Sequence, residues 1–168
     1  MYKINWVGAQ IQLKNCTFKL KDGGANEISV KIGEGTLTYD EKRTMEYVRN
    51  LGVLDTVREG DEEPMDVSFE FVWEQLTAVS TSGAGTPTVE DALKQRGEAA
   101  SWVTTSSDDC EPYCVDIEVV HTPVCGSETS ETYLFPDFRW TSLAHDIREG
   151  TVSVTGQCNA TQATITRG

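Results

Sequence analysis

Residues 66–74 read DVSFEFVWE, and their side-chain pattern decides the class of fold. Val67, Phe69, Phe71 and Trp73 occupy every second position, and the residues between them are mostly polar. Successive side chains of a β-strand point to opposite faces, so this alternation predicts a strand with one buried face. A helix would instead repeat its apolar residues every three or four positions.

The same alternation recurs along the chain in short segments separated by turn residues. The turns are Asp22-Gly23-Gly24, Gly33-Glu34-Gly35, Pro136-Asp137 and Glu149-Gly150, which suit tight connections between antiparallel strands. The predicted strands are 28–32, 36–39, 66–74, 115–121, 133–135, 138–143, 151–155 and 163–166, with weaker candidates at 10–13 and 17–20.

One segment, at about 87–96, predicts a short α-helix. Thr86 suits the N-cap, Pro87 suits the first helical position, and Gly97 suits the residue that follows the helix. The sequence therefore predicts a mainly β protein, an antiparallel β-sandwich or barrel with one short flanking helix. The predicted core is Val67, Phe69, Phe71, Trp73, Ile117, Val119, Phe135 and Phe138.

Composition and charge indicate one acidic domain spanning residues 1–168, with a long acidic loop at about 41–64. The 168 residues carry 27 acidic and 14 basic side chains, a net charge of −13. Surfaces that bind nucleic acids or anionic membranes need clustered cations, so neither kind of surface is expected. No apolar run is long enough to span a membrane, and the first residues do not resemble a signal peptide. The first 31 residues are nevertheless basic, with a net charge of +3.

Catalysis is not expected from this sequence. It contains neither a phosphate-cradling glycine loop nor a Gly-x-Ser-x-Gly nucleophile motif. Pairs of carboxylates are unspecific in a chain this acidic. We therefore expect no enzyme activity and no cofactor.

Five cysteines leave three interpretations open. Cys110, Cys114, His121 and Cys125 offer four zinc-type ligands, although their spacing matches none of the usual zinc templates. Disulfides or cross-links among Cys16, Cys110, Cys114, Cys125 and Cys158 are a second interpretation. Because the count is odd, one thiol would remain to link neighbouring subunits. Inert buried thiols are the third.

Two stretches carry a resemblance to a known family. The first is residues 33–74, with the core Val57-Arg-Glu-Gly-Asp-Glu-Glu-Pro-Met-Asp-Val-Ser-Phe69, and the second is residues 133–161, with Gly150-Thr-Val-Ser-Val-Thr-Gly156. In these stretches the chain resembles bacteriophage tail tube proteins, also called major tail proteins, which are similar in fold to type VI secretion tube proteins. The cysteine cluster at 110–125 departs from that family's general pattern.

The resemblance implies a structural virion protein. Such proteins form hexameric rings that stack into a hollow tail tube around a tape measure protein, and DNA passes through the tube into the host. Expected partners are further copies of the chain, the tape measure protein, the tail terminator, baseplate or tip proteins, and a sheath if the tail is contractile. DNA is expected only in transit, and no membrane is expected. The protein is expected to be made in the host cytoplasm and to reside in the virion.

The resemblance also suggests roles for charged residues. Candidate lumen-facing residues are Asp66, Ser68, Glu70, Asp116 and Glu118, where carboxylates would repel the phosphate backbone of DNA. The acidic loop is expected to contact the basic N-terminal region of the next ring. The residues expected at this inter-ring contact are Asp55, Glu59, Asp61, Glu62 and Glu63 on one side and Lys14, Lys19 and Lys21 on the other.

Two other classes of function remain open from the sequence. One is a β-sandwich binding module of a virion or surface, for which Trp6, Trp102 and Trp140 would be the aromatic contacts. The other is a small zinc-binding protein centred on the cysteine cluster, which would unfold when its metal is removed.

Overall fold

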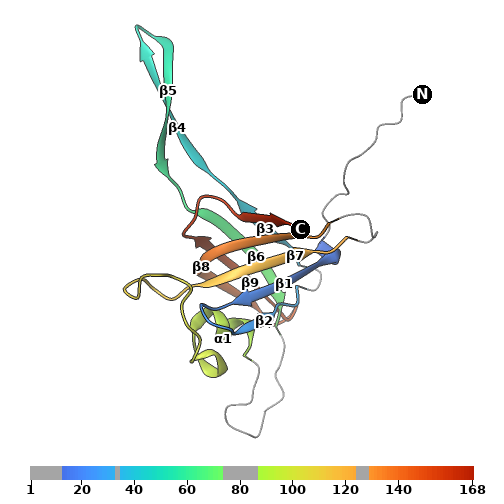
Figure 1. The fold of residues 1–168 in the computed structure, drawn as a ribbon. Helices are drawn as coiled ribbons and strands as arrows, with labels where there is room; N and C mark the ends of the chain where they lie inside the picture. Colours follow the sequence, from blue (N-terminus) through green and yellow to red (C-terminus); the bar gives the residue numbers. More distant parts are fainter. Residues whose placement is uncertain (1–12, 33–34, 74–86, 124–128) are drawn as a thin grey trace, which may run out of the picture.

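A computed structural model describes residues 13–32, 35–73, 87–123 and 129–168 (Figure 1). It confirms the mainly β, antiparallel class with one short α-helix. The elements, in chain order, are η1 (Leu13–Asn15), β1 (Cys16–Lys21), β2 (Glu27–Ser29), β3 (Leu37–Asp40), β4 (Arg43–Asn50), β5 (Val53–Glu62), β6 (Met65–Val72), α1 (Val89–Lys94), η2 (Gly97–Ala99), β7 (Val115–His121), β8 (Glu131–Asp146), β9 (Thr151–Cys158) and β10 (Thr164–Arg167).

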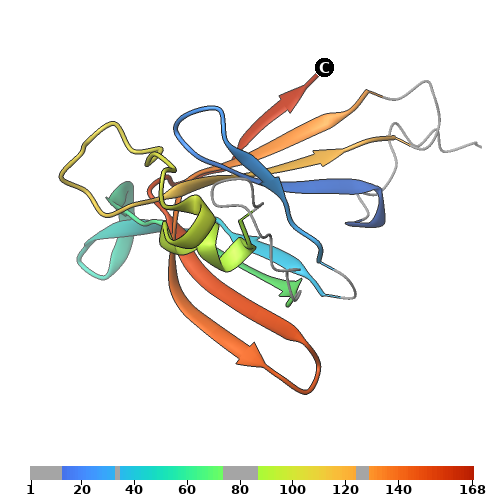
Figure 2. The same ribbon diagram turned by 90° about the horizontal axis from the view of Figure 1, so that it is seen from below.

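Strand β8 is shared by the two layers of a sandwich. Its first half pairs with β7 and β10, and its second half pairs with β9. The strand order is β2-β1-β7-β8-β9-β6-β3, so β8 connects a layer of β2, β1 and β7 to a layer of β9, β6 and β3 (Figure 2). The edge strands β2 and β3 stand at the two ends of this order.

The inner faces of both layers form one apolar core. β6, β7 and β9 alternate strictly between buried and less buried residues, as the period of two predicts. Seven of the eight predicted core residues are buried. Trp73 is the exception, because β6 ends at Val72 and the Trp73 side chain remains 42% exposed.

The predicted turn at Pro136-Asp137 is wrong, because one continuous strand replaces the two predicted there. A register shift leaves one extra residue in β8 between the pairs Ile117↔Phe135 and Val115↔Phe138. Asp137 has a left-handed φ of 52° at this bulge. A bulge bends its strand and increases the local twist, which lets β8 leave one layer and enter the other.

Helix α1 is shorter than predicted and has different caps. Thr88 is the N-cap, and its hydroxyl accepts a hydrogen bond from the Asp91 N–H at 3.1 Å. The C-cap is Gln95, which has a left-handed conformation. The helix therefore ends before Gly97, the residue predicted to follow it. Ala92 and Leu93 are the buried residues of α1. The helix thus covers one end of the sandwich.

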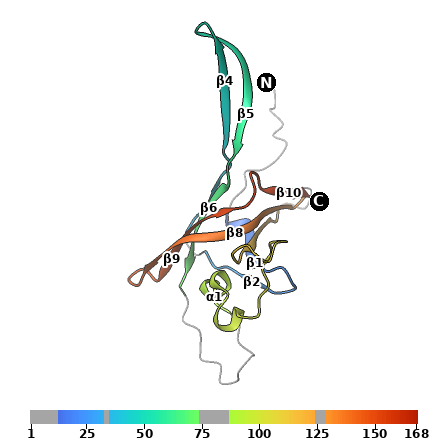
Figure 3. The same cartoon turned by 90° about the vertical axis from the view of Figure 1, so that its left-hand side faces the viewer.

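The predicted acidic loop at 41–64 is a β-hairpin. β4 and β5 pair with each other in a separate two-stranded sheet that projects from the sandwich (Figures 1 and 3). At the ordinary rise per residue, the ten residues of β5 extend about 33 Å. The loop prediction was wrong because the many charged residues of this segment made the alternation of its apolar residues difficult to recognise.

The turn between β1 and β2 is tied to a distant loop by Asp22. This buried carboxylate accepts hydrogen bonds from the backbone N–H groups of Gly24, Asn26 and Val103 and from the Asn26 amide, at 2.8–3.1 Å. Burial by itself would raise the pKa of Asp22, but these hydrogen bonds outweigh burial and hold the pKa below its ordinary value.

We predict that Asp22→Asn lowers the free energy of unfolding by about 2 kcal/mol at pH 7, because an amide would direct donors at the Asn26 amide and Val103 N–H. A carboxylate with a lowered pKa stabilises the fold above its unfolded pKa, and this contribution is lost as the pH falls through the folded pKa. Urea unfolding at pH 7 and pH 3 tests both statements. The exposed Asp109→Asn is the control, and an equal loss in both variants would contradict the prediction.

Candidate assembly surfaces

The β4–β5 hairpin has one apolar face. The register Tyr47↔Val57, Met45↔Glu59 and Arg49↔Leu54 places alternate residues of the two strands on the same side. We call Met45, Tyr47, Leu54 and Val57 the apolar hairpin face, and the charged Arg49 and Glu59 flank them on the same side. Tyr47, Leu54 and Val57 are 58%, 63% and 52% exposed, so the described chain leaves this face largely in water.

The opposite face of the hairpin is more polar. Glu46 and Arg58 are cross-strand partners there and form an ion pair at 2.7 Å. Val48 and Val53 share this face, and Leu51 at the tip is 98% exposed. A lone two-stranded hairpin is marginally stable in water. A partner on its apolar face would supply the burial that the hairpin lacks.

Of the residues predicted at the inter-ring contact, the acidic ones lie together on the hairpin, whereas the basic ones are spread over two elements. Asp55, Glu59, Asp61 and Glu62 lie on β5, and Glu63 follows it and accepts a hydrogen bond from Thr44. On the other side, Lys14 lies exposed in η1, and Lys19 and Lys21 lie on β1.

The two lysines of β1 already have partners within the chain. Lys19 pairs with Glu27 at 3.2 Å, and Lys21 pairs with Glu118 at 2.7 Å. A neighbouring ring would have to compete with these ion pairs, so charge is a weaker basis for an inter-ring contact than the sequence suggests.

The candidate lumen residues fall on two different surfaces. Asp66, Ser68 and Glu70 lie on the outer face of β6, beside β9 and β3. Asp66 pairs with Lys42 at 2.6 Å and accepts a hydrogen bond from Gln157, and the Ser68 hydroxyl lies 2.9 Å from that of Thr38. These contacts make a continuous polar surface over three strands.

Asp116 and Glu118 do not belong to that surface. They lie on the outer face of β7, in the other layer of the sandwich. Glu118 is paired with Lys21, and Asp116 accepts a hydrogen bond from the Asp137 N–H at 3.0 Å. Burial raises the pKa of Asp116. The five candidates therefore lie on two surfaces of the chain, and which of them faces a lumen stays a prediction.

The zinc interpretation is wrong because β7 separates its ligands. Cys114 precedes β7 and His121 ends it, so their α-carbons lie about 23 Å apart. Zinc holds all its ligands within a few ångströms. Cys110 is exposed in the loop before β7, and Cys125 lies outside the described residues.

The disulfide predictions have no support among the described cysteines, because no disulfide joins Cys16, Cys110, Cys114 and Cys158. Cys114 is buried, and its Sγ lies 3.2 Å from the Thr105 hydroxyl and 3.7 Å from an Asp137 carboxylate oxygen. Burial raises the pKa of Cys158 to about 12. Both side chains are buried, as the interpretation of buried thiols expects.

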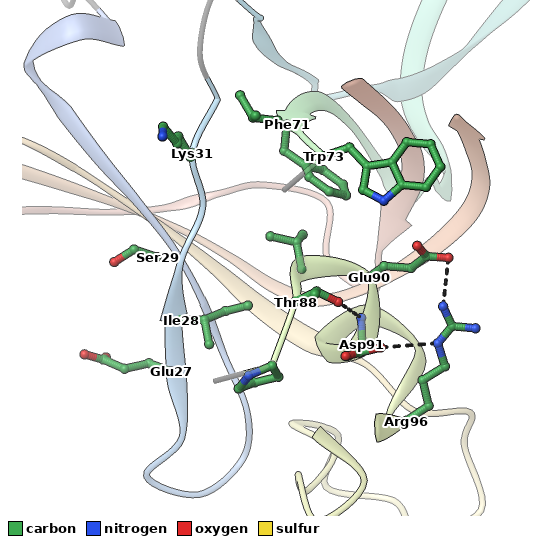
Figure 4. Close-up of a pocket in the computed structure, with 13 residues that line it drawn as sticks. Glu27, Ile28, Ser29, Lys31, Phe71, Trp73, Thr88, Glu90, Asp91 and Arg96 are labelled. Carbon is green, nitrogen blue, oxygen red and sulfur yellow. Dashed lines mark hydrogen bonds and ion pairs between the residues drawn. The ribbon is translucent and has the colours of Figure 1, made fainter. Parts of the chain in front are cut away.

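A pocket of 610 Å³ lies between β2, the end of β6 and α1 (Figure 4). Its charged groups are largely paired with neighbours: Glu90 and Asp91 both contact Arg96, at 3.0 and 3.4 Å. Glu90 also contacts His145 at 3.2 Å and thereby joins α1 to the β8–β9 hairpin. These contacts indicate a role for the pocket walls in positioning the helix.

A groove of 510 Å³ opens between β3 and the inner face of the other layer. Four consecutive residues, 36–39, form one wall, and Val119, Tyr133, Phe135 and Cys16 form the other. Tyr39 packs against Phe135 with ring centroids 4.8 Å apart. We call this the β3 groove. It exposes apolar side chains where the sandwich is open.

Sequence reasoning missed both the apolar hairpin face and the β3 groove. The alternation Met45, Tyr47 in β4 was a usable signal for the hairpin, but the cross-strand register was needed to show that Leu54 and Val57 share that side. The groove had no local signal, because its lining comes from β1, β3, β7 and β8, which are separate segments of the chain.

Among the described residues, no helix is long and apolar enough to cross a membrane. No protein-family model and no curated protein matches the sequence.

Two solved structures share the fold over almost the whole chain. One is the sheath/tube terminator of an extracellular contractile injection system, PVC, in its extended state. It has a TM-score of 0.54 and 12% identity, and the alignment covers 96% of this chain and 99% of that one. The other is the tube-terminating cap of the anti-feeding prophage, with a TM-score of 0.53, 12% identity and coverage of 99% and 97%. At this identity the likeness establishes the fold.

We predict that the described cysteines differ strongly in reactivity. Exposed Cys110 should react with maleimide at pH 7.5 at least about a hundred times faster than Cys114 or Cys158, because the thiolate is the nucleophile and burial suppresses it. Mass spectrometry of the labelled peptides measures each site. Urea should abolish the difference, and fast labelling of Cys158 in the native protein would contradict the prediction.

Proposed function

We propose that this chain is a structural subunit of a phage-tail-like particle, which assembles as hexameric rings that stack into a hollow tube. The observation that carries the proposal is the projecting hairpin, whose apolar face has no partner in the described chain. Such a surface needs a second chain to cover it. The fold shared with two tube-terminating proteins supports the same class of assembly.

The expected role is to form the wall of a channel. Its partners would be further copies of itself, a tape measure protein in the lumen, a terminator, baseplate or tip proteins, and a sheath in a contractile tail. DNA would pass through the lumen without specific binding. We place the protein in the virion and assign it no enzymatic activity.

A second candidate is a single ring that caps a tube made of another protein. The two structural neighbours favour it, because both are described as tube terminators or caps. Electron microscopy of the concentrated protein separates the candidates. Filaments of many stacked rings indicate a tube subunit, isolated rings indicate a cap, and monomers at every concentration, with and without added tube protein, would contradict both.

Removal of the hairpin should abolish assembly and leave the sandwich folded. The Cα atoms of Arg43 and Glu62 are paired, so a short Gly-Ser turn can replace the residues between them. The hairpin belongs to a separate two-stranded sheet, and we therefore expect an unchanged urea midpoint together with the loss of rings and filaments in electron micrographs. Assembly of the shortened chain at wild-type yield would contradict the proposal.

The polar surface on β6 is the candidate lumen surface. In particles that release DNA, Glu70→Lys should slow release, because a cation in the channel attracts phosphate. The exposed Glu98→Lys, on η2 at the helix end of the sandwich, is the matched control with the same charge change. A fluorescent DNA-binding dye follows the rate. Equal release rates for the two variants and for the wild type would show that β6 does not face the lumen.

A further inference from the structure

The β3 groove combines two features that a β-ribbon can use. Its lining is mainly apolar, with Leu37, Tyr39, Tyr133 and Phe135 among its residues. It also runs along β3, which ends the strand order and, within the described parts of the chain, pairs with β6 on one side alone. The other edge of such a strand presents backbone N–H and C=O groups to an incoming strand.

The hairpin offers the complementary features. The apolar hairpin face supplies side chains for the groove. Among the described residues, β4 and β5 pair with each other alone, so each has an outer edge available. Arg49 lies on the same side as Tyr47 and forms no ion pair among the described residues. Beside the groove, Glu131 accepts a hydrogen bond from the Tyr133 hydroxyl and is already paired with Arg167 at 3.1 Å, so apolar contact is the main attraction that the groove offers.

The hairpin does not fill the groove of its own chain. It projects away from the sandwich (Figures 1 and 3), and its apolar residues remain more than half exposed at Tyr47, Leu54 and Val57. A second copy of the chain can satisfy both surfaces at once. Such a contact is heterologous, because it joins two different surfaces, and it therefore repeats from copy to copy into a closed ring or an open filament.

We propose that the β3 groove is the receptor for the hairpin of a second copy of this chain, with the apolar hairpin face inserted against Tyr39, Tyr133 and Phe135. This rests on the proposed function, and it names the surface that receives the hairpin. It also replaces the acidic-to-basic contact expected from the sequence with an apolar one, which makes assembly tolerant of salt.

A photo-cross-linker at the hairpin tests the location directly. Tyr47 is replaced by p-benzoylphenylalanine, which keeps an aromatic ring there, and the protein is assembled from a mixture of ¹⁴N- and ¹⁵N-labelled chains. The expected cross-links carry both labels and join Tyr47 peptides to peptides containing residues 36–39 or 133–135. Cross-links within one chain, to residues 1–12 of another copy, or to any other surface would overturn the proposal.

A pair of valine substitutions separates the two faces of the hairpin. Val57→Asp puts a charge on the apolar hairpin face, whereas Val53→Asp puts the same charge on the opposite face of the same strand, where the side chain is 69% exposed. We expect Val57→Asp to lower the assembled fraction about tenfold or more, as a substitution at an interface hot spot does, and Val53→Asp to change it little. Equal effects of the two substitutions would overturn the proposal.

Tyr39→Glu tests the groove side at a residue that is 41% exposed. It should match Val57→Asp in assembly, with an unchanged urea midpoint confirming that the monomer folds. Filaments whose cross-links fall outside the groove would overturn this inference and leave the tube proposal in place. Cross-links to the groove in small oligomers without tubes would support the inference and overturn the tube proposal. If neither filaments nor groove cross-links form, both proposals are overturned.

Discussion

The bend in β8 is the constraint on which the rest of the structure depends. One strand serves both layers. The bulge at Asp137 therefore places the inner face of β7 opposite the inner face that β9 and β6 share. The bend also requires a close approach at Gly156, where an added Cβ would lie 2.2 Å from the Arg139 carbonyl oxygen and 2.7 Å from the Phe138 ring. The glycine in this otherwise alternating strand therefore has a steric reason.

The sandwich is open beside β3, where the β3 groove lies. The β3 groove exposes part of the core, and the hairpin exposes an apolar face of its own. Both surfaces cost free energy in an isolated chain, since apolar area in contact with water is unfavourable. In the assembly that we propose, contacts between copies would bury both surfaces, with the hairpin as donor and the groove as receptor.

Local chemistry explains why some predictions from the sequence were right. Alternation over seven residues located β7 at 115–121, and the Asp22-Gly23-Gly24 turn between β1 and β2 followed from residue types that favour tight turns. Predictions that needed partners far along the chain failed. Pro136-Asp137 looks like a turn locally, but pairing with β7 and β9 makes it a bulge inside one strand. Sequence alternation also did not show that the candidate lumen residues lie in two different layers, because it does not say which layer a strand joins.

The sequence by itself determined the mainly β class, most of the core and the placement of the single helix, because each depends on periodicity and turn chemistry within a few residues. Tertiary structure alone decided that residues 43–62 form a projecting hairpin, that Met45, Tyr47, Leu54 and Val57 share one face, and that β3 borders an apolar groove. These features depend on cross-strand register and on which edges remain open. Register is set by pairing between distant segments, and local pattern cannot specify it.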